Sequence, residues 1–445
     1  MPSPTTPYGA PPQTGLSREI LALAVPAFAT LISEPLLLMA DSAMVGHLGT
    51  RQLAGLGLAS SVLSIINGLC VFLAYGTTSL VARRIGAGDT RRALAGGIDG
   101  MALGVLLGLT LALGLHIGAP TVTGWYGAPA DVQSQAVAYL EIAGWGLPML
   151  LLMLASTGVL RGLKDTRTPL YVAVSMNLAN IALNALFMYG LGMGIRGSAL
   201  GTVLSQAVGA SVLAWVVLRG ARAAGTPIAV RFSGVLAAAR GGSWLVLRSV
   251  WLQAALAVTV GVAAQTGQIG LAGHQVTNSI WSFLCLALDA LAIAAQAMVG
   301  HELGAGDADK VRSITAKLCW WGAGGGAVFA VLLVLARGLL APVFTPDAQV
   351  QALLMRLLLV LALITPIAGI AFVLDGVLIG AGDARYLAFA GMVASLCYLP
   401  LAWLVDQRSA GVVWLWVAYG GYLLARVATL TVRARTDAWM RLGEH

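Results

Sequence analysis

Long apolar stretches follow one another along the chain, and each is close to the roughly twenty residues that cross a bilayer as a helix. Short segments with glycine, proline and charged residues separate them, which favours helices joined by turns over strands. Twelve spans are predicted, at Leu16–Gly46, Leu53–Arg83, Arg92–Pro120, Val132–Leu160, Pro169–Leu191, Gly197–Arg219, Gly241–Ala264, Ala272–Glu302, Val311–Leu340, Gln349–Ile379, Tyr386–Val405 and Gly411–Thr431.

The two halves of the chain repeat each other at a constant offset of 218 residues. Leu53–Gly55 matches Leu271–Gly273, and the turn Gly86–Asp89 matches Gly304–Asp307. Further ungapped matches pair Gly158–Leu160 with Gly376–Leu378, Pro148 with Pro366, and Asp165 with Asp383. Six spans separate the copies, so both copies have the same orientation in the membrane. Repeats of this kind occur in transporters, with the substrate site between or within the halves.

The repeat predicts an all-α polytopic membrane protein made of two pseudo-symmetric six-helix bundles, with a basic linker between them. The predicted divisions are a disordered cytoplasmic tail at 1–15, an N-lobe at 16–219, a linker at 220–240, a C-lobe at 241–433 and a C-terminal tail at 434–445. The tail is rich in proline and has no basic stretch typical of a cleavable signal peptide.

Composition and charge agree with a membrane protein and argue against a nucleic-acid partner. The 445 residues are 58% hydrophobic and 10% charged, with a net charge of +8. Nineteen of the 26 Lys and Arg residues fall at the termini or in the loops after even-numbered spans. This is the positive-inside pattern, so we expect both termini in the cytoplasm and the spans in the plasma membrane, which is the inner membrane where a cell has two. We expect a monomer that contacts lipid and small molecules.

Acidic and amide side chains inside the apolar spans are the candidate site of the N-lobe. Glu34 and Asp41 are seven residues apart and share one helical face, and Asn177, Asn180 and Asn184 share another. A carboxyl group inside the membrane costs several kcal/mol if it stays charged there, so it should face protein or water. The remaining candidates are residues of span 6, methionines of a cavity and prolines that bend span 1: Thr202, Gln206, Met39, Met176, Pro26 and Pro35.

The C-lobe carries a different set of buried charges. Arg248, Asp289 and Asp375 are predicted to form one ion-paired cluster, whose plain interpretation is a structural salt bridge. Arg356 and Arg426 are expected to reach toward membrane interfaces. Asp41 has Thr259 at the repeated position, so the acidic groups do not follow the repeat.

No motif for catalysis, a metal or a cofactor accompanies these residues. The glycine-rich turns lack GxxxxGK[ST], His301-Glu302 lacks a second histidine, and GxSxG is absent. The four cysteines form no CxxC pair. We therefore expect neither an enzyme nor a bound metal or cofactor, with an ion gradient as the energy source.

The chain resembles the multidrug and toxic compound extrusion (MATE) transporters over about Leu16–Arg433. The resemblance rests on the runs Ala40–Gly49, Leu53–Gly55 and Val81–Asp89, and Phe372–Asp383 is similar to the DinF-like branch in particular. It implies two six-helix bundles that form a V around a central cavity, and export of organic, often cationic compounds against inflow of protons or sodium.

The resemblance also implies roles for single residues. Asp41 matches the proposed coupling aspartate of DinF-like members, with Asn180 and Thr202 in its hydrogen-bonding surroundings. Some relatives carry a second aspartate where this chain has Asn184, which leaves the coupling on Asp41. The expected function is export of cationic amphipathic compounds by antiport with protons through alternating access. Sodium coupling and flipping of a lipid-linked precursor are the alternatives.

Overall fold

A computed structural model describes residues 15–443 of the chain, and the described part is built from helices without any strand. Within it, twelve helical segments are long and apolar enough to cross a membrane. The predicted all-α fold with twelve spans is therefore confirmed. Most of the predicted N-terminal tail, residues 1–14, and the last two residues of the predicted C-terminal tail lie outside the described residues.

Fourteen α-helices make up the two lobes within residues 15–443. The N-lobe contains α1 Leu16–Gly46, α2 Thr50–Cys70, α3 Phe72–Gly86, α4 Thr90–Gly124, α5 Ala130–Ala143, α6 Leu147–Gly162, α7 Arg167–Ala185 and α8 Ile195–Ala223. The C-lobe contains α9 Phe232–Gln265, α10 Gly267–Ala305, α11 Ala308–Phe344, α12 Ala348–Gly380, α13 Ala384–Gln407 and α14 Val412–Ala434, followed by a 3₁₀ turn at Asp437–Trp439.

Two spans that the sequence predicts as continuous are broken helices. The second span is interrupted at Val71, between α2 and α3, and the fourth by the 3₁₀ turn Gly144–Gly146, between α5 and α6. Pro148 has no N–H for the carbonyl of Gly144, which explains the break in the fourth span. The seventh span also begins earlier than predicted, because α9 starts at Phe232 rather than Gly241.

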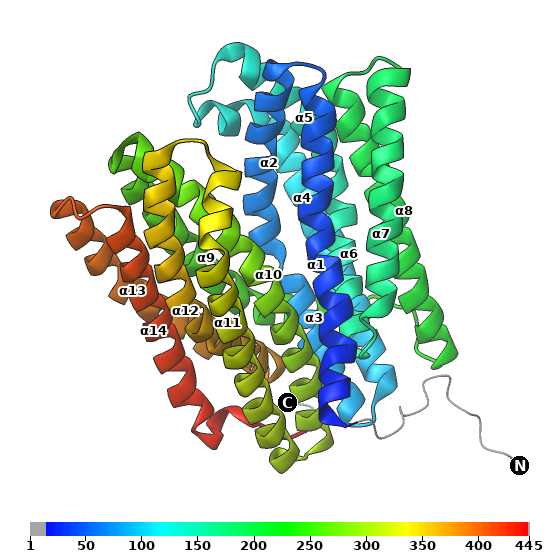
Figure 1. The fold of residues 1–445 in the computed structure, drawn as a ribbon. Helices are drawn as coiled ribbons and strands as arrows, with labels where there is room; N and C mark the ends of the chain where they lie inside the picture. Colours follow the sequence, from blue (N-terminus) through cyan, green and yellow to red (C-terminus); the bar gives the residue numbers. More distant parts are fainter. Residues whose placement is uncertain (1–14, 444–445) are drawn as a thin grey trace, which may run out of the picture.

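The two lobes lie side by side, with α1 and α10 in contact between them (Figure 1). The start of α1 and the end of α14 lie at the same end of the molecule, which we call the terminal end, and the opposite end is called the far end. Because α1 begins at the terminal end, its C-terminal half with Asp41 lies toward the far end.

Glycines of the repeated turns bring the lobes together at the terminal end. A Cβ atom at Gly86 of α3 would overlap the carbonyl oxygen of His301, and one at Gly304 of α10 would overlap that of Arg83. These two contacts are related by the repeat. The Arg83 side chain adds a hydrogen bond of 2.7 Å from Nη1 to the carbonyl of Ala381. The repeated glycines are therefore an interface between the lobes as well as turns.

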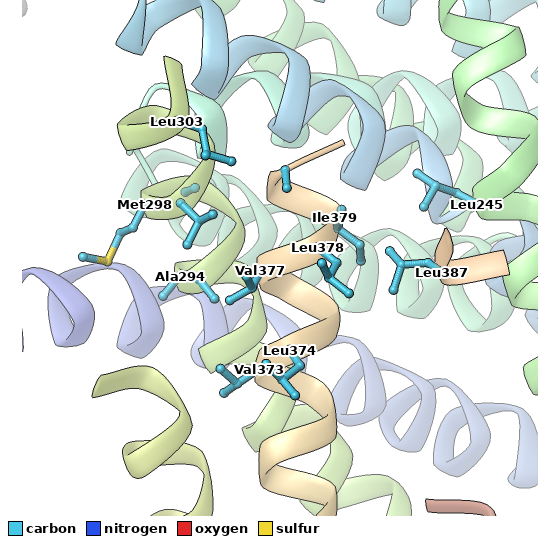
Figure 2. Close-up of a cluster of buried hydrophobic side chains, with 14 of the residues drawn as sticks. Leu245, Ala294, Met298, Leu303, Val373, Leu374, Val377, Leu378, Ile379 and Leu387 are labelled. Carbon is cyan, nitrogen blue, oxygen red and sulfur yellow. The ribbon is translucent and has the colours of Figure 1, made fainter. Parts of the chain in front are cut away.

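The largest cluster of buried apolar side chains extends this interface. Figure 2 shows its C-lobe part, where Ala294 of α10 lies near Val377 of α12. Ile20 and Leu73 of the N-lobe belong to the same cluster. Burial of such side chains stabilises a fold by about 1.5–3 kcal/mol each in water, but in a membrane close packing takes over this role.

Within residues 15–443, the hydrogen bonds between the lobes all lie in the half of the molecule near the terminal end. They join Tyr75 to Asp289 and Gln296, and they join Ser79 and Arg83 to the backbone carbonyls of Gly380 and Ala381 at the end of α12. Near the terminal end of α4, Asp99 binds Arg231, with 2.7 Å between Oδ2 and Nη2. The lobes are thus held closed at the terminal end.

Candidate functional site

Asp41 lies inside the N-lobe at the head of a chain of amide and hydroxyl groups. Its Oδ1 accepts a hydrogen bond of 2.6 Å from Nδ2 of Asn184, which also donates to Oδ1 of Asn180 at 3.0 Å. Asn180 in turn donates to the hydroxyls of Thr202 and Ser205, at 3.0 and 3.2 Å. Asp41, Asn180, Asn184 and Ser205 are all buried. Three helices, α1, α7 and α8, therefore meet through one hydrogen-bonded network, which we call the N-lobe network.

Gly201 and Tyr139 complete the surroundings of this network, and the sequence reasoning missed both. A Cβ atom at Gly201 of α8 would overlap Oδ1 of Asn184, so only glycine allows α7 to approach this closely. The buried Tyr139 of α5 lies beside Thr202 and interacts electrostatically with Asp41. The regular part of α7 ends directly after Asn184, in the π-helical turn Leu186–Gly190. Such turns are frequent at functional sites.

The other predicted N-lobe residues lie outside this network. Glu34 is solvent-accessible and accepts a hydrogen bond of 3.1 Å from Nδ2 of Asn67 on α2. Asn177 donates to the carbonyl of Ser33 at 2.9 Å and so ties α7 to α1. Met39 is 69% exposed; it is two residues from Asp41 and so points to the other side of α1.

Gln206 and Met176 pack within the lobe. A Cβ atom at Gly146 would overlap Oε1 of Gln206, and one at Gly209 would lie 2.9 Å from Sδ of Met176. Both side chains therefore fill space left by glycines at helix contacts. Neither contacts Asp41 through a hydrogen bond in the described structure.

Both prolines of α1 lie inside a continuous helix. Pro26 cannot donate to the carbonyl of Ala22, and the hydroxyl of Thr166 donates to that oxygen instead, at 3.4 Å. Pro35 follows Glu34 and also lies inside α1. The helix is thus weakened at two places between the closed terminal end and Asp41.

In the C-lobe, the predicted charges occupy two adjacent groups. Arg248 of α9 and Arg426 of α14 both bind Oδ2 of Asp375 on α12. Asp289 accepts a longer hydrogen bond, 3.4 Å, from the hydroxyl of Tyr75 across the lobe interface. The buried Arg161 of α6 also interacts electrostatically with Asp289.

Arg426 does not extend to a membrane interface, and that expectation is wrong. It is 6% exposed because Asp375 supplies a buried counter-charge. Sequence reasoning could have paired them, since an intramembrane arginine needs a partner. Tyr75 and Arg161 gave no comparable signal, because their role depends on contact between the lobes.

The repeat allows the N-lobe network to be compared with its counterpart. Residues 218 positions after Asp41 and Asn180 are Thr259 and Tyr398, whose hydroxyls are hydrogen-bonded at 2.6 Å. Asn184 has the buried Ala402 as its counterpart.

In the last helix of each lobe the offset becomes 217. Both helices begin after a glycine, Gly194 before α8 and Gly411 before α14. This pairs Thr202 and Ser205 with Tyr419 and Tyr422. Tyr398 packs against both tyrosines, with ring centroids at 6.1 and 5.9 Å, as Asn180 binds both hydroxyls in the N-lobe. The C-lobe has aromatic rings where the N-lobe has polar groups.

Known proteins with similar sequences were found for the whole length of the chain. The family model MatE matches residues 26–186 and 245–404. Protein DETOXIFICATION 44, chloroplastic, of Arabidopsis thaliana is 29% identical, over 97% of this chain and 85% of its own length. DNA damage-inducible protein F (DinF) of Escherichia coli is 28% identical, over 94% of this chain and 92% of its own. A probable multidrug resistance protein NorM of Bradyrhizobium diazoefficiens is 27% identical, over 99% of both.

Solved structures show the same fold. A MATE transporter in a bent conformation superimposes with a TM-score of 0.88 at 21% identity, over 96% of both chains. A Vibrio cholerae MATE transporter gives 0.87 at 22% identity, over 96% of this chain and 98% of that one. Members of the family are transporters rather than enzymes, and the predicted resemblance is confirmed. The chain is homologous to DinF, and it therefore belongs to the MatE family of multi-pass membrane transporters of small molecules.

Proposed function

We propose that the protein exports cationic amphipathic compounds by antiport with protons, and that Asp41 carries the proton. One observation supports this proposal above the others. The buried Asp41 carboxyl is hydrogen-bonded to Asn184, in a network of otherwise uncharged side chains. A carboxylate in such surroundings attracts either a proton or a cationic ligand, and binding of one opposes binding of the other.

The orientation of the Asn184 amide gives less support to sodium at this position. Asn184 turns its N–H group toward Asp41, and a donor stabilises a carboxylate without coordinating a metal ion. Sodium remains the second candidate because Oδ1 of Asn184 is buried without a hydrogen-bond partner and would supply one oxygen ligand. A lipid-precursor flippase has less support, because Arg248 and Arg426 share the counter-charge of Asp375.

The closed interface at the terminal end supports a mechanism of alternating access. The basic loops predict that both termini lie in the cytoplasm, so that the terminal end faces the cytoplasm. This conformation is then closed to the cytoplasm. Asp41 lies toward the opposite side and would take up its proton from there. Opening of the terminal end would require α3 and α10 to separate at Gly86 and Gly304.

The cycle is then a competition for one carboxylate. Deprotonated Asp41 holds the cationic substrate when the protein opens to the cytoplasm. After the lobes close at the terminal end, protonation of Asp41 from outside removes the negative charge and the substrate leaves. The proton and the substrate drive the cycle only if they favour different conformations. Pro26 and Pro35 give α1 two places at which such a change can bend it.

Transport by purified protein in liposomes tests both the carboxylate and the ion. A proton gradient at fixed sodium should drive uptake of a fluorescent cation such as ethidium, and a sodium gradient at fixed pH should not. Asp41→Asn, which keeps the size of the side chain, should lower the proton-driven rate at least tenfold. Glu34→Gln serves as the matched acidic control on the same helix. Full transport by Asp41→Asn would overturn the proposal, and transport that follows only the sodium gradient would select sodium.

A further inference from the structure

The C-lobe contains a cavity of about 330 Å³ at the counterpart of the N-lobe network. Residues of α9, α10, α12 and α14 line it, including Thr259, the residue at the repeated position of Asp41. Its two well-exposed lining residues, Val260 and Ser282, belong to α9 and α10. The cavity is therefore accessible between these two helices. We call it the C-lobe cavity, and its volume is within the range of about 300–1,000 Å³ that small-molecule pockets have.

Aromatic rings form much of the wall of this cavity. Trp281 meets Tyr419 at 5.7 Å between ring centroids and 86° between planes, and Trp416 meets Tyr419 at 5.6 Å and 70°. His274 lies 5.8 Å from Trp416. The two edge-to-face contacts of Tyr419 fix the rings against one another and leave ring faces and edges for a ligand. A flat aromatic molecule is the shape that such walls accommodate best.

Polar groups without partners point to a ligand that binds them. His274 and Trp416 are each 2% exposed and line the cavity, yet both ring nitrogens of His274 and Nε1 of Trp416 have no hydrogen-bond partner in the described structure. A buried polar group left unpaired costs about 1–3 kcal/mol. Two such groups at one cavity indicate that the cavity binds a ligand that forms hydrogen bonds with them.

Donors outweigh acceptors among these groups. Trp416 Nε1–H can only donate, and the guanidinium of Arg426 lines the same cavity. Arg426 and Arg248 share the single negative charge of Asp375, so this group of three keeps one net positive charge. Neutral His274 supplies one donor and one acceptor, and Asn278 also supplies both kinds. Among the described residues that line the cavity, none is acidic. The charge of Arg426 opposes a cationic ligand, although aromatic rings alone would accept one.

We propose that the C-lobe cavity binds planar aromatic carboxylates. Their rings pack among Trp281, Trp416 and Tyr419, and the carboxylate accepts hydrogen bonds from Trp416 and His274. The site is separate from Asp41 and opposite to it in charge preference. The proposal does not rest on proton-coupled export of cations, because its residues belong to the other lobe.

Equilibrium binding of radiolabelled 2-naphthoate to the full chain in phosphatidylcholine nanodiscs tests this site. Wild-type protein should bind 2-naphthoate saturably, at one site per chain. N,N,N-trimethyl-2-naphthylammonium, the cation of similar shape, should compete at least tenfold more weakly. Equal competition by the cation, or no saturable binding of 2-naphthoate, would overturn the proposal without any variant.

Variants place the binding in the cavity. Trp416→Phe removes the N–H group and keeps an aromatic ring, and it should weaken 2-naphthoate binding about tenfold, the cost of one hydrogen bond to a charged group. His274→Leu should weaken it to a similar extent. Trp414→Phe is the matched control, because Trp414 is 59% exposed on the same helix outside the cavity. Its affinity should equal that of the wild type.

Gel filtration and the unfolding temperature of each variant show whether it is folded. Unchanged affinity in folded Trp416→Phe and His274→Leu would overturn the proposal, as would an equal loss in Trp414→Phe. Because the two test residues are on different helices, misfolding of one variant still leaves the other decisive.

Discussion

The two lobes share one scaffold but differ in what lies at equivalent positions. In the N-lobe, Asp41 and Asn180 belong to a network of amides and hydroxyls. In the C-lobe, Thr259 and Tyr398 stand at the same places, and aromatic rings surround them. The repeated scaffold therefore holds two chemically different interiors, and an ion-coupled site is expected in only one of them.

The difference also separates two kinds of buried carboxylate. Asp41 is paired with a neutral amide, so either a proton or a cation can occupy it. Asp375 is bound by two arginines and is already neutralised. Buried position alone does not make a coupling residue, since the partners decide whether a carboxylate is available for exchange.

The largest predicted effect is on stability, at Asp375. Asp375→Asn leaves Arg248 and Arg426 buried without their counter-charge, which should lower the free energy of unfolding by about 3–5 kcal/mol. Asp41→Asn should change it by less than about 1 kcal/mol, because a neutral amide pair replaces a single charged hydrogen bond. Denaturant unfolding in detergent compares the two variants. Equal destabilisation would remove the distinction between the two carboxylates.

A second prediction concerns the helix contact that the N-lobe network requires. Gly201→Ala places a Cβ atom against Oδ1 of Asn184 and should displace that amide from Asp41. Proton-driven drug transport should then fall more than tenfold in liposomes. Gly114→Ala on α4 has open space around the added atom and should transport normally. Normal transport by Gly201→Ala would mean that the contact between Asn184 and Asp41 is not needed.

Asn184→Ala tests the hydrogen bond itself and makes this position resemble Ala402 of the C-lobe. Loss of one hydrogen bond to a carboxylate should weaken binding of a cationic drug about tenfold at neutral pH, because the deprotonated form loses its donor. Fluorescence titration with ethidium measures this affinity. Asn177→Ala removes an amide of the same helix that donates to a backbone carbonyl, and it is the matched control. Equal affinities of Asn184→Ala and the wild type would contradict the assignment.

The smallest predicted effect concerns the C-lobe counterpart of Asn180. Tyr398→Phe removes the hydroxyl that is bonded to Thr259 at 2.6 Å and keeps the ring contacts with Tyr419 and Tyr422. The free energy of unfolding should fall by about 1 kcal/mol, and proton-driven transport should stay within twofold of the wild type. A loss of transport as large as that of Asp41→Asn would place coupling in both lobes.

The sequence predicted the fold well because the spans and the repeat can both be read directly from the order of residues. Twelve spans follow from apolar length, and the lobes follow from matches at a constant offset. Helix breaks at Val71 and at Gly144–Gly146 were missed, since hydropathy does not report backbone geometry. The earlier start of α9 was missed because the basic segment before Gly241 looked like a loop, although it forms helix from Phe232 onward.

The polar members of the N-lobe network were predictable, and the residues that shape it were not. Asp41, Asn180, Asn184 and Thr202 were found as polar side chains in apolar spans, and the structure brings them together. Gly201 acts by lacking a side chain, which no single sequence reveals. The C-lobe cavity was missed for a related reason, because tryptophans and tyrosines of apolar spans are usually packing or interface residues.

Proton release on substrate binding is the most direct test of the claim that one carboxylate exchanges a proton for a drug. Ethidium is added to purified protein in weakly buffered detergent solution, and released protons are measured with a pH indicator from pH 5 to 8. We predict release that approaches one proton per bound ethidium at some pH in this range, and none from Asp41→Asn. No release from the wild type at any of these pH values, or equal release from Asp41→Asn, would contradict the account.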